Sequence, residues 1–596
     1  MEWKAPMDIF DLITLLGGLG FFLYGMTLMG SGLKSAAGSK LEGFLEKLSS
    51  TPLRGVLLGT VVTAIIQSSS ATTVMVVGFV NSGIMKLSQA IGIVMGANIG
   101  TTVTGWILCL ADVGGEAMFF EFLKPSTFAP LMVFAGTVMV AFIKDTRKQN
   151  IGRIILGFGT LMMGMSNMSA AAEPLSEMPE FVNLVTIFSN PLLGILVGAM
   201  MTAVIQSSSA SVGILQALAL SGAMPYSTVV PMILGIGIGA CVPVLLSAIG
   251  ANVNGKRTAL IYLYFNLLRT LIILPLFYIA NAIFQFGFMN ENANMFGIAM
   301  INTLFNVFAT LMLFPFTKGM EKLAVLSVRG PKEEENKPDS MLELIDKRFL
   351  ATPEYALQQC HTVISHMAEM DLFNITTAIK LQSEYEHELG EQIEKNENLA
   401  DEYEDSLGSY LVEISRLNLP EKESYLASMY IHSVGDFERI SDHSMNLCEL
   451  AQKIHRGKIL FSEAARLELD TINEAVTETL TLAVKAFKES DRQAAMQIQP
   501  LEEVIDQLCA GLKDRHVTRL QQGLCTIATG FVFNDILNNY ERISDHCSNI
   551  AIYVLRSQDS VFDPHKYQVD IEHKAYYDES LRSYKDKYLR NIGLEV

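Results

Sequence analysis

A polar tetrad, Gln-Ser-Ser-Ser, stands twice in the middle of a long apolar stretch, and this feature most constrains the fold. The two stretches are Leu53–Val80 and Leu192–Leu220. Each arm beside a tetrad has about 13 residues, or roughly 20 Å of helix, which is too short to cross a hydrocarbon core of roughly 30 Å. A polar tip at membrane depth is tolerated only inside protein or beside a cavity. Each stretch therefore predicts a re-entrant hairpin whose arms enter and leave on one side.

The hairpins belong to an internal repeat. Gln67 and Gln206, which begin the tetrads, lie 139 residues apart, and the same offset aligns glycines elsewhere without a gap. The aligned glycines are Gly18, Gly20, Gly25, Gly96 and Gly100 in one copy and Gly157, Gly159, Gly164, Gly235 and Gly239 in the other. One unit has therefore been duplicated, over residues 9–144 and 152–285.

The remaining apolar runs predict membrane spans. We place them at residues 9–31, 87–110, 127–144, 152–170, 226–250, 258–285 and 295–316. An odd number of crossings separates the start of one copy from the start of the next, so the second copy is expected to be inverted. Inverted repeats with broken helices are typical of secondary transporters, whose binding site lies near the membrane midplane.

Loop charges predict the orientation. Basic loops (Lys34, Lys40, Lys47, Arg54; Lys144, Arg147, Lys148, Arg153; Lys256, Arg257) fall on one side, and acidic loops (Asp112, Glu116, Glu121; Glu173, Glu177, Glu180) on the other. The first apolar run lacks a basic leader and a cleavage site, so we expect it to be retained as a helix. By the positive-inside rule, the N-terminus is outside and the C-terminal half is cytoplasmic, in the inner (cytoplasmic) membrane of a bacterial cell.

The C-terminal half differs in composition from the membrane half. The chain is 50 % hydrophobic yet has a net charge of −18, and most of the charge lies after the linker at residues 329–341. We predict a membrane domain at 1–328, a helical domain at 342–560 and a polar tail at 561–596, for which no function can be inferred. The seven cysteines show no paired spacing, so neither a disulfide framework nor a zinc site is expected. The acidic balance argues against a nucleic-acid partner.

The tetrads offer binding chemistry at the tips. Where the first arm ends near Ile66 its last carbonyls are free, and where the second arm begins its first N–H groups are free. Carbonyl ends and side-chain oxygens suit a small cation such as Na⁺, whereas free N–H groups suit an anion. The alternative is that the serines only cap a turn. Two copies of the tetrad favour the binding interpretation.

The paired tetrads, with Gly96-Ala97-Asn98-Ile99-Gly100-Thr101-Thr102 after the first, resemble the Na⁺/phosphate cotransporter family, in its type II-like bacterial form. The resemblance covers about residues 9–316 and implies that the tetrads bind phosphate and the coupling ion Na⁺. The implied ligands are Gln67, Ser68, Ser69, Ser70, Gln206, Ser207, Ser208 and Ser209, with Asn98, Thr101 and Thr102 for sodium. The second copy reads Gly235-Ile236-Gly237-Ile238-Gly239-Ala240-Cys241, which lacks the amide and both hydroxyls. Sodium sites in that copy are therefore in doubt.

Arg269 is an ionisable residue inside a predicted span, and such residues are functional candidates by default. It is a candidate phosphate ligand; the alternatives are pairing with backbone carbonyls or snorkelling. Asn266, nearly one turn earlier, is either a ligand or a partner in a helix–helix hydrogen bond.

The C-terminal half also repeats. Asp436–His443 matches Asn539–His546 at helical spacing, and we expect two three-helix bundles. Glu438 and Asp442, like Glu541 and Asp545, are i,i+4 neighbours that repel unless a cation neutralises them. The pattern resembles PhoU-type phosphate-response proteins, which implies a divalent or ferric ion at these four carboxylates and control of phosphate uptake. The alternative is a solvated face with salt bridges to Arg439 and Arg542; His443 and His546 are secondary candidates as ligands.

These observations predict an all-α polytopic membrane protein with inverted repeats, two re-entrant hairpins and a cytoplasmic PhoU-like helical bundle. The predicted function is sodium-coupled symport of inorganic phosphate across the lipid bilayer. A transporter of another small oxyanion and a membrane-tethered phosphate sensor are the alternatives, and a homodimer is an open alternative for the oligomeric state. No P-loop, HExxH or GxSxG motif stands in the required context, so we do not expect an enzyme.

Overall fold

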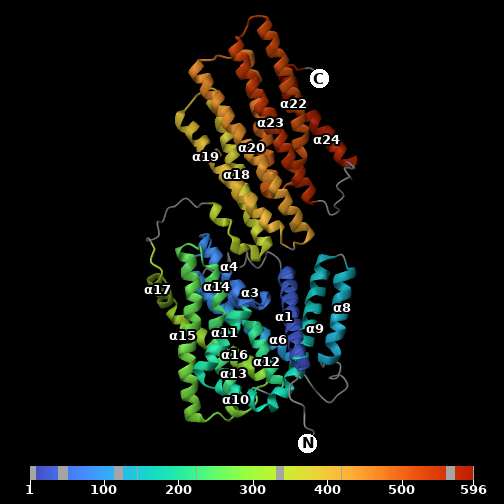
Figure 1. The fold of residues 1–596 in the computed structure, drawn as a ribbon. Coiled ribbons are helices and arrows are strands. Elements are labelled where there is room, and N and C mark those ends of the chain that lie inside the picture. Colours follow the sequence, from blue (N-terminus) through green and yellow to red (C-terminus); the bar gives the residue numbers. More distant parts are fainter. Residues whose placement is uncertain are drawn as a thin grey trace. The chain divides into compact units, whose positions relative to one another are not determined.

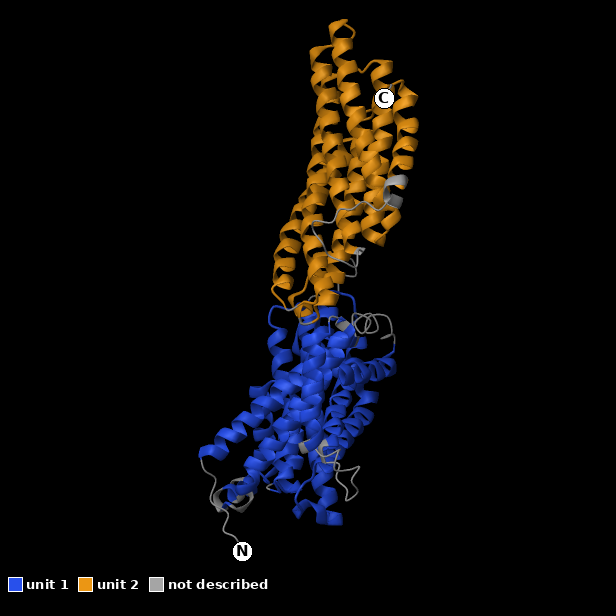
Figure 2. Ribbon diagram, turned by 90° about the vertical axis from the view of Figure 1, so that its right-hand side faces the viewer, with its two compact units in different colours: residues 1–339 blue, residues 340–596 orange. Residues whose placement is uncertain are grey.

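The computed structural model describes residues 9–37, 51–112, 125–143, 145–222, 224–330, 341–417, 419–558 and 571–594. It divides into two compact units, Met1–Asp339 and Ser340–Val596, which are coloured separately in Figure 2 and described separately below. The described residues form helices and an isolated β-bridge between Pro225 and Asn292, with no strand. The all-α prediction is confirmed.

The first unit contains both repeats and a closing segment (Figure 1). The first repeat comprises α1 (Ile9–Ala37), α3 (Pro52–Ile66), α4 (Ser69–Asn81), α5 (Leu87–Gly100), α6 (Thr102–Leu108), η1 (Cys109–Asp112) and α8 (Pro125–Phe142). The second comprises α9 (Thr146–Ala172), η2 (Glu173–Glu177), α10 (Pro179–Ile187), α11 (Pro191–Ile205), α12 (Ser208–Leu220), α13 (Tyr226–Gly239), α14 (Cys241–Ser247) and α15 (Val253–Phe284). The closing segment comprises η3 (Gly287–Asn290), α16 (Met295–Leu313), η4 (Phe314–Phe316) and α17 (Thr317–Ser327).

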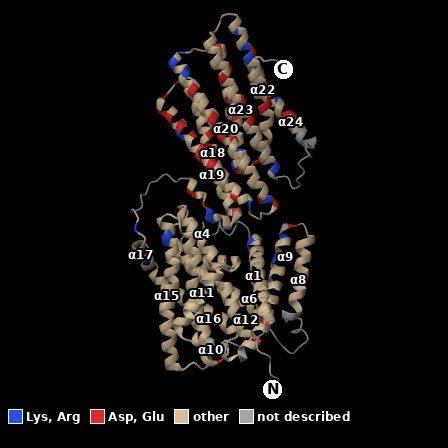
Figure 3. Ribbon diagram, in the orientation of Figure 1, with Lys and Arg blue, Asp and Glu red and all other residues tan. Residues whose placement is uncertain are grey.

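Six helical segments among the described residues are long and apolar enough to span a membrane. They are Ile9–Ala36, Leu87–Leu108, Arg147–Leu175, Tyr226–Ser247, Val253–Phe284 and Met295–Ser327. The seventh predicted span corresponds to α8, whose apolar part, Thr127–Phe142, is shorter. In Figure 3 the middle of these helices is almost free of charge, and basic residues gather where α1 ends and where α9 and α15 begin. Glu116, Glu121, Lys40 and Lys47 lie outside the described residues.

The two repeats are inverted with respect to each other. Helices α1 and α9 begin the two copies, and they pack side by side in opposite directions. A Cβ atom on Gly25 would lie 2.3 Å from the Leu161 nitrogen, and one on Gly164 would lie 2.3 Å from the Phe22 nitrogen. The 139-residue offset exchanges these two contacts. Equivalent helices therefore run antiparallel around a local two-fold axis, as the odd number of crossings predicted.

Glycine allows the helix pairs of each repeat to touch at the backbone. A Cβ atom on Gly96 of α5 would lie 2.0 Å from the Val56 carbonyl oxygen of α3. In the second repeat, a Cβ atom on Gly235 of α13 would lie 2.0 Å from the Ile195 oxygen of α11. No side chain fits at either position. These contacts hold the first arm of each broken helix, α3 or α11, against the helix that comes after the second arm, α5 or α13. They thereby fix where the tip of each broken helix lies.

The second unit is made of two three-helix bundles, as expected. The first contains η5 (Met341–Leu344), η6 (Lys347–Ala351), α18 (Pro353–Leu381), α19 (His387–Ser415) and α20 (Glu421–Gly457). The second contains α21 (Glu463–Glu489), α22 (Arg492–Gln521) and α23 (Ile527–Gln558), followed by α24 (Ile571–Tyr584), η7 (Lys585–Leu589) and η8 (Arg590–Ile592). The predicted polar tail thus contains a helix, α24, that packs on α22, where the Tyr577 hydroxyl donates to Glu503 Oε2 at 2.6 Å.

Candidate functional site at the helix breaks

Both tetrads interrupt a helix in the same way. Gln67 ends α3 with φ 63° and Gln206 ends α11 with φ 60°, a left-handed conformation in which the chain turns out of the helix. The next residue caps the second arm: the Ser68 hydroxyl accepts from the Ala71 N–H at 3.2 Å, and that of Ser207 from the Ala210 N–H at 3.3 Å. These two residues, the first serine of each tetrad, therefore act as N-caps.

The following serines bring the two repeats together. Ser69 is the first residue of α4 and Ser208 the first residue of α12, and their hydroxyl oxygens lie 3.4 Å apart. The Ser209 hydroxyl donates to the Gln67 carbonyl oxygen at 3.3 Å, so one tip bonds the backbone of the other. The Tyr262 hydroxyl of α15 donates to Ser69 Oγ at 3.2 Å. The two tips therefore form a single buried polar cluster.

A second pair of helix junctions borders this cluster. The break between α13 and α14 lies at Ala240, whose carbonyl accepts from the Ser70 hydroxyl at 3.1 Å. In the first repeat, the Thr104 hydroxyl of α6 donates to Gln67 Oε1 at 2.8 Å. Thr101, at the junction of α5 and α6, has a buried hydroxyl oxygen without a hydrogen-bond partner among the described residues. Each tip therefore contacts a helix junction, but the two contacts differ.

The side chains depart from the symmetry of the backbone. Gln67 is buried, whereas Gln206, its equivalent, is exposed. Asn98 is buried and donates from Nδ2 to the Val94 oxygen, and Thr102 donates to the Ile99 oxygen. The offset places Asn98, Thr101 and Thr102 on Gly237, Ala240 and Cys241, so the polar groups of the first junction are absent from the second.

Arg269 lies beside the second junction. Its Nη1 donates to Asn306 Oδ1 at 2.5 Å and its Nη2 to the Leu234 carbonyl oxygen at 3.2 Å. The predicted pairing with a backbone carbonyl is therefore present, and none of the recorded bonds joins Arg269 to a tetrad. Asn266 donates to the Tyr262 carbonyl oxygen of its own helix at 3.0 Å and to Cys241 Sγ of α14 at 3.5 Å, so the helix–helix hydrogen bond considered for it is present.

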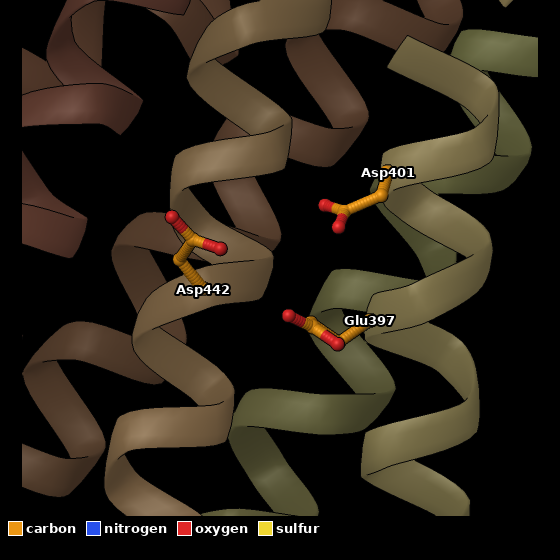
Figure 4. A group of neighbouring side chains, drawn as sticks. All are labelled: Glu397, Asp401 and Asp442. Carbon is orange, nitrogen blue, oxygen red and sulfur yellow. The ribbon is translucent and has the colours of Figure 1, made fainter. Parts of the chain in front are cut away.

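The second unit brings carboxylates together in two equivalent places. Glu397, Asp401 and Asp442 form one triad and Glu502, Asp506 and Asp545 the other, each with oxygens within 4.8 Å of one another. In Figure 4 the carboxylates of the first triad point toward one another from two helices. Burial, and to a smaller extent the negative charges of Asp401 and Asp442, raises the pKa of Glu397. Burial, with Asp506 and Asp545, raises that of Glu502 to about 7.

These triads overlap only partly with the predicted metal ligands. Asp442 and Asp545 belong to them, whereas Glu438 and Glu541 do not. Glu541 accepts from Lys513 at 2.9 Å, and Arg439 lies 3.5 Å from Glu438. Arg439 also lies 3.6 Å from Asp442 and Arg542 3.5 Å from Asp545, so the predicted salt bridges are present as well. The clustered oxygens nevertheless suit a hard multivalent cation.

The two histidines lie between the bundles, and each contacts a residue of the other bundle. His546 Nδ1 lies 2.8 Å from Asp436 Oδ1, and His443 Nδ1 lies 2.8 Å from Asn539 Oδ1. The rings themselves are 5.9 Å apart. Neither histidine belongs to a carboxylate triad among the described residues.

Comparison with known proteins identifies both units. The sequence profile of the Na⁺/Pi-cotransporter family matches residues 21–170 and 178–302, and that of the PhoU domain matches residues 364–451 and 469–554. The first unit therefore matches the Na⁺/Pi-cotransporter family and the second unit matches the PhoU domain. The chain is a multi-pass membrane protein of a phosphate transporter family. The profile covers both tetrads and both junctions, so the cotransporter unit contains the whole polar cluster.

Similarity extends to individual relatives and to a solved structure. The chain is 25 % identical over 561 residues to YjbB of Escherichia coli (strain K12), whose assigned name is that of an inorganic phosphate export protein; the match covers 92 % of this chain and 98 % of YjbB. It is 40 % identical over 110 residues to sodium-dependent phosphate transport protein 2B of Homo sapiens, covering 18 % and 16 %. A crystal structure of PhoU from Pseudomonas aeruginosa covers 34 % of this chain and 96 % of that one, with 20 % identity and a TM-score of 0.32.

The structure adds residues that the sequence analysis missed. In the cotransporter unit they are Tyr262 and Thr104, which bond Ser69 and Gln67. Tyr262 had a readable signal, because it lies one helical turn before Asn266 and two before Arg269. In the PhoU domain the missed carboxylates are Glu397, Asp401, Glu502 and Asp506, which repeat the Glu-x-x-x-Asp spacing of the predicted pairs.

Proposed function

We propose that the chain is a sodium-coupled symporter of inorganic phosphate in the bacterial cytoplasmic membrane. The observation that carries the proposal is the meeting of the two tips. Helices α4 and α12 begin at Ser69 and Ser208, whose hydroxyls are 3.4 Å apart, so two helix N-termini converge on one place. Each N-terminus carries about +0.5 elementary charge and free N–H groups, the arrangement that binds oxyanions.

Hydroxyl groups complete the anion site. Ser69, Ser208 and Tyr262 can each donate to a phosphate oxygen once they exchange their present mutual contacts for the ligand. The two N-termini together supply at most about one positive charge, which does not balance a divalent phosphate in a low-dielectric interior. A cation that binds with the phosphate supplies the balance, and this requirement is the physical reason for coupling.

Oxygen ligands for that cation lie in the first repeat. The C-terminal end of α3 presents its last carbonyls at Gln67, and Thr101 has a buried hydroxyl oxygen without a partner among the described residues. Asn98 lies within a turn of Thr101 on the same helix. Carbonyl, amide and hydroxyl oxygens are suitable ligands for Na⁺ at a broken helix. Both the tetrads and these residues are thus proposed as the binding site.

The direction of net flow depends on the gradients. In symport with Na⁺, phosphate follows the inward Na⁺ gradient unless the opposing phosphate gradient is larger. Net export by the same site is a second candidate function, because YjbB, matched over 92 % of this chain, is named for phosphate export. Basic residues at the ends of α1, α9 and α15 support a cytoplasmic PhoU domain. We assign that domain the regulation of transport, with divalent or ferric ions held at its carboxylate triads.

Uptake of labelled phosphate into proteoliposomes tests the proposal. Uptake should stop when Na⁺ is replaced by K⁺ or choline, and a tenfold excess of sulfate should not compete. Ser69→Ala and Ser208→Ala should each raise the phosphate KM by about 10- to 100-fold, because each removes a hydrogen bond to a charged ligand worth about 1.5–3 kcal/mol. Ser221→Ala, at the far end of α12, is the matched control and should leave the KM unchanged. Uptake that is independent of Na⁺, or unchanged KM values in both tip variants, would refute the proposal.

A further inference from the structure

Arg269 is a buried cation with an incomplete set of partners. Arg269 is 2 % exposed, and its guanidinium donates hydrogen bonds to the neutral oxygens of Asn306 and Leu234. No carboxylate pairs with it among the described residues, and its Nε has no hydrogen-bond partner there. A guanidinium held in this way retains its full charge and remains available to compensate an anion.

The position of this guanidinium is tied to the repeat. Gly237 is the residue that the 139-residue offset places on Asn98. A Cβ atom on Gly237 would lie 1.9 Å from Arg269 Nη2 and 2.6 Å from its Cζ. A side chain at residue 237 and the guanidinium therefore exclude each other. The guanidinium, together with Asn266 Oδ1 at 2.6 Å from the same Cβ position, fills the space next to α13 that the Asn98 side chain takes next to α5.

Both side chains donate to a carbonyl of the helix before the junction, although the offset places Val94 on Ile233 and not on Leu234. In the first repeat, Asn98 Nδ2 donates to a carbonyl of its own helix, that of Val94, at 2.9 Å. In the second repeat, Arg269 Nη2 donates to the Leu234 carbonyl of α13, three residues before Gly237. The offset carries Arg269 onto Pro130 of α8, which is exposed and has no charge, so the first repeat has no corresponding cation.

We propose that the Arg269 guanidinium is the permanently bound cation of the second repeat and takes the place of a second coupled Na⁺. The inference rests on the proposed sodium-coupled transport. The first junction has amide and hydroxyl oxygens and binds an exchangeable ion. The second has lost them and has a cation fixed to α15 instead. Part of the phosphate charge is then balanced by the protein itself, and fewer Na⁺ ions move per phosphate.

Restoring the ligand while removing the arginine tests this idea. The variants are Arg269→Gln alone, Arg269→Lys, and the double variant Arg269→Gln with Gly237→Asn, each as the full chain in proteoliposomes. Wild-type uptake should follow Na⁺ with a Hill coefficient of about 1, since a coefficient cannot exceed the number of coupled sites. Arg269→Gln should raise the phosphate KM at least about tenfold, because it removes a charge-assisted interaction. In the double variant the Hill coefficient should rise toward about 2.

The outcomes separate the inference from the proposed function. Wild-type uptake that does not depend on Na⁺ refutes the symporter and, with it, the inference. A wild-type Hill coefficient of 2 or more leaves the symporter intact and overturns the inference, and it does so even if the double variant does not fold. A double variant with a raised KM and an unchanged coefficient also overturns it, because Arg269 would then only bind phosphate.

Two further variants serve as controls. Arg269→Lys keeps the charge and should keep the wild-type Hill coefficient. Arg257→Gln removes the other buried arginine of α15, which bonds the Val328 oxygen and Asn254 at the start of the helix. This variant should leave both the phosphate KM and the Na⁺ dependence unchanged.

Discussion

Replacing Gln67 by glycine separates the backbone role of the tetrad from its chemistry. Gln67 has φ 63°, a conformation that costs a residue with a Cβ atom about 1–2 kcal/mol and costs glycine almost nothing. Glycine also loses about 0.5–1 kcal/mol more conformational entropy on folding. The backbone term therefore favours Gln67→Gly by about 0–1.5 kcal/mol. The break in the helix should persist in this variant.

The side-chain term acts in the opposite direction. Gln67 Nε2 donates to the Ala64 oxygen at 2.7 Å, and Oε1 accepts from Thr104 at 2.8 Å. Hydrogen bonds in membrane proteins contribute about 0.6 kcal/mol each on average, so the two together contribute about 1.2 kcal/mol. The two terms oppose each other, and the net loss in folding free energy should be no more than about 1.2 kcal/mol. Transport, by contrast, should be abolished if the side chain holds the coupling ion.

Gln285 is the matched control. It also has a positive φ, 48°, at the C-terminal end of α15, but it is exposed. Gln285→Gly should leave transport unchanged. Both Gln285→Gly and Gln67→Gly should alter the melting temperature by no more than about 4 °C. The assay is thermal unfolding in detergent beside Na⁺-activation curves in proteoliposomes. Normal Na⁺ activation in Gln67→Gly would refute the role of this side chain, and a large loss of stability would refute the energy balance.

Two other predictions concern packing and metal binding. Gly96→Ala should destabilise the protein by about 1–3 kcal/mol, because the added methyl group would be overpacked against the Val56 oxygen. Gly20→Ala is the control and should not destabilise the protein, since no atom lies within 4 Å of its Cβ position. Equal melting temperatures of the two variants would contradict the backbone contact. The raised pKa of Glu502, about 7, means that without metal the folding stability contributed by this residue falls as the pH rises from about 4.5 toward 7. Metal binding requires the ionised form, so the affinity for Mn²⁺, measured by calorimetry, should rise between pH 5.5 and 7 in the wild type and rise less steeply in Glu502→Gln, in which Glu397 of the other triad still has a raised pKa. An affinity independent of pH would exclude this carboxylate as a ligand.

The architecture could be predicted because it depends on patterns that repeat along the chain. The tetrads and the glycines at a constant offset predicted the duplication, the helix breaks and the inversion, which the antiparallel packing of α1 and α9 bears out. The same reasoning assigned one role to all members of a tetrad. In the structure Ser68 caps α4, whereas Ser69 contacts the other repeat. Neighbouring hydroxyls differ because a helix turns by about 100° per residue, and sequence spacing alone does not show which one faces the partner.

The PhoU domain shows a related limit. The Glu-x-x-x-Asp spacing indicated that Glu438 and Asp442 share a helix face, but a metal site needs carboxylates from different helices. Asp442 meets Glu397 and Asp401 of α19, and this choice depends on how α19 and α20 are rotated against each other. Such rotations are set by the buried side chains of the bundle. A search for every Glu-x-x-x-Asp pair would have found the candidates without showing which of them meet.

The second junction indicates why a lost motif is not necessarily a lost site. From the sequence alone, Gly237 in the place of Asn98 reads as erosion and favours a sensor without transport. In the structure, the absence of a side chain at residue 237 makes room for Arg269 of α15, which lies 32 residues further along the chain. Glycine at 237 and arginine at 269 therefore belong to one arrangement, because the guanidinium needs the space that glycine leaves open beside Asn266. A substitution at either position alone should be more harmful than the pair changed together.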